Sequence, residues 1–302
     1  MRISRFVRYT WFNIVYNLLV ILWGAYVRAS GSGAGCGSHW PLCNGEVVPR
    51  APQVETIVEF SHRLSSGLAL VFLVILFAWA WRAYPAGSLV RKGAAASLGL
   101  IVLEALFGAG LVLFEWVAQD ASIGRVISMP AHLIVTFLLL AALSLTAWWA
   151  SGGKALRLQG HGWQSRSWLL GLLGMIVIGT TGAVTALGDT LFPAETLAAG
   201  LQQDLSDQAH FLVRLRVIHP LISVAAGFWV MFHAYFFGWT HEKPAVRKLS
   251  RILFALIAIQ WAAGLLNVAL LAPIWMQLVH LLLADLAWIG LILLGAASFE
   301  AP

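Results

Sequence analysis

Acidic, imidazole and guanidinium side chains occur together in the segment Glu59-Phe60-Ser61-His62-Arg63, where a polar loop gives way to a long apolar run. Ionisable groups at a membrane boundary are costly to keep there, so they indicate a functional site. Glu59 and His62 are three residues apart, which places them on one face of a helix. This spacing predicts that His62 ligates a heme iron and that Glu59 lies beside the reacting group.

Three further histidines, His132, His219 and His280, lie in other apolar runs. Together with His62 they occupy the second, fourth, sixth and eighth of eight predicted membrane spans. All four lie within about two helical turns of the predicted outer end of their span. Two facing imidazoles can ligate a heme iron from both sides, inside an apolar bundle that accommodates the porphyrin. A hydrogen-bonded structural role is the alternative for any single histidine, but four repeated positions favour two heme sites. Zinc is disfavoured because the four histidines would have to come together from both halves of the chain, and no acidic ligands accompany them.

Arginines flank these positions on the outer side, at Arg63, Arg214 and Arg216. Arginine pairs with carboxylates in a bidentate manner, so these residues are candidates to bind heme propionates. Snorkelling to the membrane interface is an equally good interpretation of Arg214 and Arg216. Arg28 and Arg125 are further, less strongly supported candidates.

The composition requires a membrane setting for these groups. The chain of 302 residues is 60% apolar and 11% charged, with a mean hydropathy of +0.82, whereas soluble domains are roughly 25% charged. Its 15 Trp suit aromatic belts at membrane interfaces. We therefore predict an all-α polytopic membrane protein in contact with lipid, and no nucleic-acid partner despite the net charge of +6. Apolar runs of the length that crosses a bilayer predict spans at 11–29, 60–81, 95–116, 129–150, 167–187, 213–238, 252–271 and 275–297.

Basic residues gather in alternate connections, and acidic residues gather in the others. By the positive-inside rule, this pattern predicts a cell-membrane protein with both termini in the cytoplasm. The two cysteines, Cys36 and Cys43, then lie outside, close together in a Gly- and Pro-rich loop. A close pair in an oxidising compartment favours a disulfide. Two free thiols, or a metal site with His39, are the alternatives, and a disulfide could be structural or redox-active.

The chain contains a weak internal repeat. Gly24-Ala25-Tyr26-Val27 corresponds to Gly182-Ala183-Val184-Thr185, and the segment from Glu104 to Gly108 corresponds to the segment from Gln260 to Gly264. Four spans per copy make the copies parallel. We predict two four-helix bundles, at residues 1–150 and 167–302, joined by a cytoplasmic linker at 151–166.

Two acidic residues fall inside predicted spans, which makes them functional candidates by default. The correspondence of Glu104 with Gln260 favours an interhelical hydrogen bond over catalysis for Glu104. Asp285 is expected to point away from the histidine face and to pair with a neighbour such as Asn267.

The string from Gly31 to Gly45, with Cys36, Trp40-Pro41-Leu42 and Cys43, resembles the heme A synthase family, as does Glu59-Phe60-Ser61-His62-Arg63. Arg214-Leu215-Arg216-Val217-Ile218-His219-Pro220 adds to the resemblance, which extends over nearly the whole chain. Some family members carry a second cysteine pair between spans five and six. Here the segment from Asp189 to His210 has none, and we expect it to cover the second heme site.

The resemblance implies an oxidoreductase that converts a methyl group of heme O to a formyl group by successive hydroxylations, giving heme A for terminal oxidases. His62 and His132 would hold the substrate heme, His219 and His280 a permanent heme b, and Glu59 would be the catalytic acid. Heme O synthase, a protoheme farnesyltransferase, is a sensible partner because free heme is reactive. The alternative function is a di-heme b-type cytochrome that exchanges electrons with a quinone, for which Glu59 is not needed.

Overall fold

The computed structural model describes residues 4–301 and is built from helices, with no strand among those residues. Eight of its helical segments are long and apolar enough to cross a membrane, which confirms the predicted number of spans. They are α1 (Arg5–Ala29), α2 (Val54–Ala83), α3 (Leu89–Leu113), α4 (Ile123–Ala150), α5 (Gly162–Leu191), the segment Phe211–Gly238, α9 (Pro244–Ala269) and α10 (Ile274–Ser298).

Several of these helices extend beyond the apolar runs because polar residues continue the helix past the hydrocarbon. Ser4, Ser88 and Ser122 each precede a helix, and their hydroxyl oxygens accept hydrogen bonds from backbone N–H groups three residues on. Such caps satisfy donors that the first helical turn leaves free. As a result α1 begins at Arg5 rather than near residue 11, and α4 begins at Ile123 rather than 129.

Each half of the chain packs its spans in a closed ring of neighbours. In the first half α1 contacts α2, α2 contacts α3, α3 contacts α4, and α4 returns to α1. In the second half the same cycle runs through α5, α8 (Ile218–His233), α9 and α10. The even-numbered spans of each half therefore lie on a diagonal of their ring. This packing agrees with the predicted parallel repeat, which stays a prediction.

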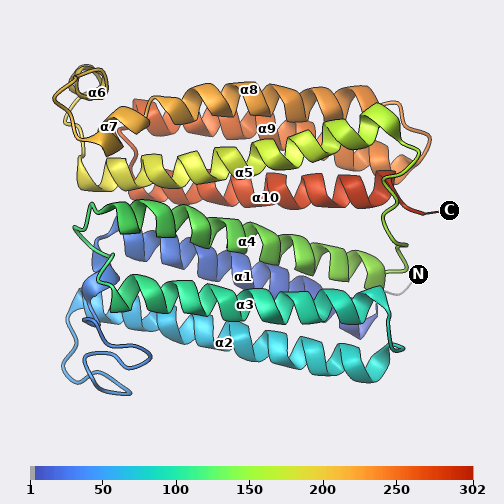
Figure 1. Cartoon of the computed structure of the whole chain (residues 1–302), viewed down its shortest axis with the longest axis horizontal. Coiled ribbons are helices and arrows are strands. Elements are labelled where there is room, and N and C mark those ends of the chain that lie inside the picture. The colour runs from blue at the N-terminus through green and yellow to red at the C-terminus, as the bar shows by residue number, and fades with distance from the viewer. Residues whose placement is uncertain (1–3, 302) are drawn as a thin grey trace.

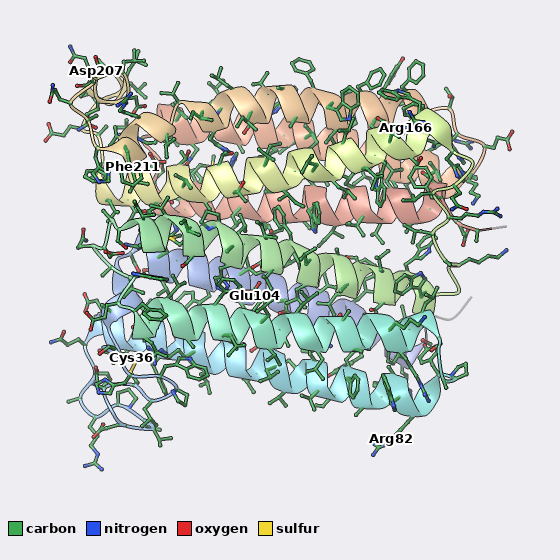
Figure 2. All side chains as sticks on the ribbon, in the orientation of Figure 1. Cys36, Arg82, Glu104, Arg166, Asp207 and Phe211 are labelled. Carbon is green, nitrogen blue, oxygen red and sulfur yellow. A yellow bond between two sulfur atoms is a disulfide. The ribbon has the colours of Figure 1, made fainter. Side chains whose placement is uncertain are left out.

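The two rings lie side by side, with α1 and α4 facing α5 and α10 (Figure 1). Phe137 on α4 stacks on Trp288 of α10, and the Trp288 indole N–H donates to the Phe137 carbonyl at 2.6 Å. The start of α1 and the end of α10 lie at one end of the molecule (Figure 1). Arg82 and Arg166 lie at that same end, whereas Cys36, Asp207 and Phe211 lie at the opposite one (Figure 2).

The sixth span is interrupted, which the hydropathy pattern did not predict. A short helix, α7 (Phe211–Leu215), ends before α8 begins, and the five-residue π-helix η2 (Ala234–Gly238) follows α8. Proline has no N–H, so Pro220 cannot donate to the carbonyl of Arg216, where a continuous helix would need that bond. The segment before α7 also contains the short helix α6 (Leu197–Asp204).

Candidate functional site

The loop that carries the cysteines is fixed on the start of α2. Cys36 and Cys43 form the predicted disulfide, and the Thr56 hydroxyl of α2 donates to the Gly35 carbonyl at 2.7 Å. The backbones are so close here that a Cβ on Gly35 would overlap the Glu55 carbonyl group. Within the described residues no group of three or more His, Cys, Asp and Glu side chains is arranged to hold a metal ion. The disulfide is therefore the interpretation that the geometry bears out.

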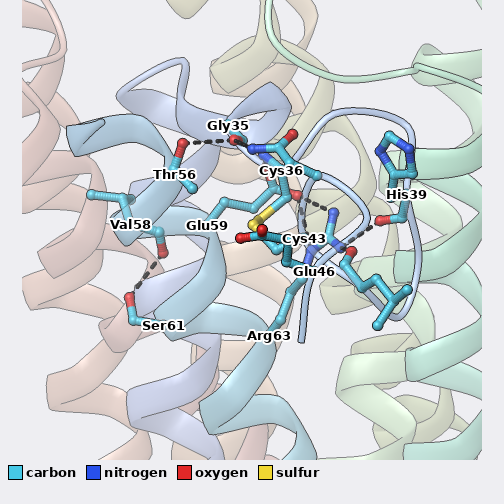
Figure 3. The surroundings of a disulfide bond; sticks show 12 residues. Gly35, Cys36, His39, Cys43, Glu46, Thr56, Val58, Glu59, Ser61 and Arg63 are labelled. Atoms are coloured by element: carbon cyan, nitrogen blue, oxygen red, sulfur yellow. Dashed lines mark hydrogen bonds and ion pairs between the residues drawn. A yellow bond between two sulfur atoms is a disulfide. The ribbon is translucent and has the colours of Figure 1, made fainter. Parts of the chain in front are cut away.

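Glu59 is buried, with 3% of its surface exposed, between α2 and this loop. One carboxylate oxygen, Oε2, accepts the Cys36 backbone N–H at 2.8 Å, and the other accepts from Arg63 Nη2 at 2.5 Å and from Nε at 3.1 Å (Figure 3). The Arg63 Nη1 atom donates to the carbonyls of His39 and Leu42. The disulfide loop, the arginine and the carboxylate thus form one connected unit, one helical turn from His62.

His62 and His132 project from the diagonal helices α2 and α4 of the first ring. The His62 ring lies over Gly24 of α1, where an added Cβ would be 2.9 Å from the ring carbon Cε1. The Nδ1 atom of His62 is buried and has no hydrogen-bond partner. His132 Nδ1 lies 2.5 Å from the Glu104 carboxylate on α3.

His219 and His280 project from the diagonal helices α8 and α10 of the second ring, with ring centroids 6.4 Å apart. An iron held between two imidazoles by bonds of about 2 Å would separate the centroids by roughly 6 Å. Glycines again lie under the imidazoles, Gly182 beneath His219 and Gly264 beneath His280. A Cβ added to each would lie 3.0 and 3.1 Å, respectively, from the imidazole. The spacing and the space left by these glycines fit a bis-histidine heme.

The candidate propionate arginines are placed differently from one another. Arg216 is buried and binds two acids of the outer segment, Asp189 at 3.2 Å and Asp204 at 3.0 Å. It thereby fastens the end of α6 to α5, and the expected covering of the second heme site stays a prediction. Arg214 is exposed. Because Arg63 donates to protein oxygens from all three of its nitrogens, propionate binding by these residues stays a prediction.

The two weaker arginine candidates and the buried acids also have defined places. Arg125 is buried and donates to the carbonyls of Ala118 and Asp120. Arg28 reaches from α1 to α5 and α10 of the other half. Asp285 is completely buried, and neither of its carboxylate oxygens has a hydrogen-bond partner, so the expected pairing with Asn267 is wrong. The predicted interhelical hydrogen bond of Glu104 is confirmed, and its partners lie on α4.

The sequence did not predict the glycines under the imidazoles. Nor did it predict the Thr181 hydroxyl, which lies 3.2 Å from His219 Nδ1. The signal for the glycines was present, since the repeat aligns Gly24 with Gly182 and ends on Gly264. Matched glycines at a fixed distance from matched histidines indicate close helix approach. Thr181 carries no such signal, because hydroxyls are common in transmembrane helices.

Together, the fold and the site define a polytopic helical membrane protein with two diagonal histidine pairs, one of which has a buried carboxylate beside it. The model of the cytochrome oxidase assembly protein family COX15-CtaA matches residues 7–292, and the chain belongs to this family.

Individual relatives carry two different names. A protein of Thermus thermophilus, named protoheme IX farnesyltransferase, is 52% identical over 297 residues, which is 98% of this chain and 49% of that relative. Heme A synthase of Alkalihalophilus pseudofirmus is 46% identical over 97 residues, 32% of this chain and 33% of the relative. Heme A synthase of Geobacillus kaustophilus is 42% identical over 127 residues, 40% and 39% of the two chains. The chain spans half or less of the length of these relatives, and none of the three names supports a quinone-linked cytochrome.

Proposed function

We propose that this chain is a heme A synthase, which oxidises a methyl group of heme O to a formyl group by successive hydroxylations. The observation that carries the proposal is an asymmetry between two otherwise similar sites. Both rings offer a diagonal histidine pair, but only the first has a buried carboxylate, Glu59, one turn before its histidine. The second half has Arg216 at the corresponding position, bound to Asp189 and Asp204. The family and the heme A synthase relatives support this function.

In the proposed reaction the first ring holds the substrate heme through His62 and His132. His219 and His280 of the second ring would hold heme b, which would supply one-electron transfer when bound. Glu59 acts beside the substrate, where a carboxylate accepts a proton or stabilises positive charge that develops on the oxidised carbon. Arg63 and the Cys36 N–H fix the orientation of that carboxylate, so the geometry is set before substrate binds.

The proposed setting is the cell membrane, with the disulfide loop and α6 outside and both termini in the cytoplasm. A disulfide at one end and basic residues such as Arg82 and Arg166 at the other support this orientation.

We also propose that a protoheme farnesyltransferase delivers heme O. The Thermus thermophilus relative supports this because it bears that name while half of its length matches this chain. Retention of the farnesyltransferase on the affinity-tagged chain from solubilised membranes is the measurement, and failure to retain it contradicts delivery by a bound partner.

The test is pigment extraction from the full chain purified from cells that also make heme O. The wild-type chain should yield heme A, whereas Glu59→Gln should lower its yield by about 100-fold, as expected when a general acid–base group is removed. Glu55→Gln is the matched control, because Glu55 is an exposed acid one turn earlier on α2, and its yield should equal that of the wild type. Wild-type extracts that contain only heme b would overturn the proposed function. Normal heme A from Glu59→Gln would overturn the role of Glu59 alone.

A further inference from the structure

The four ligand histidines differ in what their Nδ1 atoms contact. The Nδ1 atoms of His62 and His280 are buried and have no hydrogen-bond partner, and that of His219 lies beside the Thr181 hydroxyl. Only His132 has a charged group at this position, the carboxylate of Glu104 at 2.5 Å. A carboxylate accepts hydrogen bonds and donates none, so His132 carries its proton on Nδ1 and leaves Nε2 free for a metal.

Glu104 is itself held in place. Its side chain is 11% exposed, and its second oxygen, Oε1, accepts from the Thr136 hydroxyl at 2.8 Å. Thr136 lies one turn after His132 on α4, so the histidine and the hydroxyl bind the same carboxylate from the same helix. In the part of the chain that the structure describes, no lysine or arginine nitrogen lies within 4.0 Å of Glu104. The carboxylate charge is therefore directed at the imidazole rather than neutralised by a cation.

The second ring has an amide where the first has this acid. Gln260 corresponds to Glu104 in the repeat, and its Nε2 atom lies 3.2 Å from His280 Nε2. An amide is neutral, so it cannot give the imidazole the same electrostatic push. The two histidine pairs thus differ at the histidine on the fourth span of each half. His132 has the carboxylate of Glu104 beside it, whereas His280 has the neutral amide of Gln260.

We infer that Glu104 is a positioning residue for the iron of the first ring. The contact of its carboxylate with Nδ1, at 2.5 Å, sets the tautomer and rotation of His132 and makes this imidazole a stronger donor than the other three ligands. Carboxylate partners of ligating histidines have this effect in metal sites generally. A stronger donor stabilises the ferric state, so the first-ring heme has the lower reduction potential. The inference rests on the proposed function only for the identity of His132 as a ligand.

The test measures reduction potentials rather than heme A formation. The full chain is purified in detergent and loaded with hemin, and the two hemes are titrated with a reductant. The component that His62→Ala removes identifies the first ring. Glu104→Gln keeps the size of the side chain but loses the charge, so the potential of the first-ring heme should rise while that of the second stays unchanged. Glu104→Ala should also lower the hemin affinity of the first ring by about 10- to 100-fold.

Gln260→Glu is the matched control, because it introduces a carboxylate at the equivalent position of the other ring and should leave the first-ring potential unchanged. An unchanged first-ring potential in Glu104→Gln, with normal hemin loading of both rings, would overturn the inference. So would an equal shift of both hemes in that variant. If Glu104→Gln shows the expected shift while the wild type binds hemin but makes no heme A, the proposed function is contradicted and the role of Glu104 is left intact.

Discussion

Two acidic side chains distinguish the first ring from the second at the scale of single residues. Glu59 accepts from Cys36 and Arg63, and Glu104 accepts from Thr136 and contacts His132 Nδ1. The corresponding residues of the second half are Arg216 and Gln260. Glu59 is paired with Arg63, whereas Glu104 has no lysine or arginine partner among the described residues. A carboxylate so placed stabilises positive charge on a bound group, in line with the oxidation chemistry proposed for the first ring.

Gly24, which lies under His62, provides a test of how the His62 imidazole is positioned. Gly24→Ala would place a Cβ 2.9 Å from His62 Cε1, so the imidazole must move. We expect hemin affinity of the first ring to fall by about 10-fold, the lower end of the cost of disturbing ligand orientation. Spectroscopic titration of the purified protein with hemin measures this.

Gly108→Ala is the control for this substitution, because Gly108 aligns with Gly264 in the repeat but has nothing within 4 Å of its added Cβ. Its hemin affinity should match that of the wild type. Equal losses in the two variants would show that alanine harms the bundle in general and would contradict the specific role of Gly24.

The positions of the site residues were predictable because histidines and acids are rare in apolar runs. The motif from Glu59 to Arg63 and the repeat singled out the four histidines, whose role as ligands stays a prediction. Their contacts were not predictable, since these depend on how each helix is rotated about its axis. Asp285 illustrates the limit: the pattern assigned it a partner, and the structure leaves its carboxylate without one.

At the scale of elements, hydropathy located all eight spans because each apolar run is long enough to cross the bilayer. Helix ends were harder to predict, since polar caps such as Ser122 lie outside the apolar runs. The interruption between α7 and α8 depends on Pro220, whose missing N–H was visible in the sequence. The fastening of α6 by Arg216 involves residues up to 27 positions away and was not visible.

The end of α10 is fastened to the linker between the halves, in a manner that should depend on pH. The Lys154 backbone N–H donates to the Glu300 carboxylate at 3.0 Å, and the Lys243 ammonium lies 3.2 Å from it. The Lys154 N–H, and to a smaller extent Lys243, hold the pKa of Glu300 below its ordinary value of 4.5. A lowered pKa stabilises the fastened form above pH 4.5, and this stabilisation is lost as the pH falls through the lowered value.

Hydrogen exchange of residues 153–158, corrected for the intrinsic pH dependence, measures this effect. Protection should be high at pH 6 and lower at pH 3. Glu300→Gln should already show the lower protection at pH 6 and change little on acidification. Wild-type-like loss of protection in Glu300→Gln would mean that another group controls the linker.

At the scale of the whole molecule, the two rings are attached by contacts between residues far apart in the chain. Arg28 of α1 donates to the Ala186 carbonyl at 2.7 Å, the Thr190 hydroxyl at 2.8 Å and Gln277 Oε1 at 2.7 Å. Its partners lie on α5 and α10, so one guanidinium holds two helices of the other half. Trp288 adds the bond to Phe137 deeper in the interface. Composition and repeat indicated two halves, but they gave no means to predict this junction.

Because these bonds join the rings directly, the covalent linker is not needed to hold them together. A chain divided between Gly152 and Gly153, with both fragments expressed in one cell, should reassemble and co-purify through a tag on either fragment. Arg28→Met in the divided chain should reduce co-purification, whereas Arg82→Met, at the opposite end of the molecule (Figure 2), should not. Fragments that fail to associate with Arg28 intact would contradict this view. If the fragments do associate, the protein behaves as a pair of subunits on a single polypeptide, and each half can be exchanged separately as long as Arg28 keeps its acceptors.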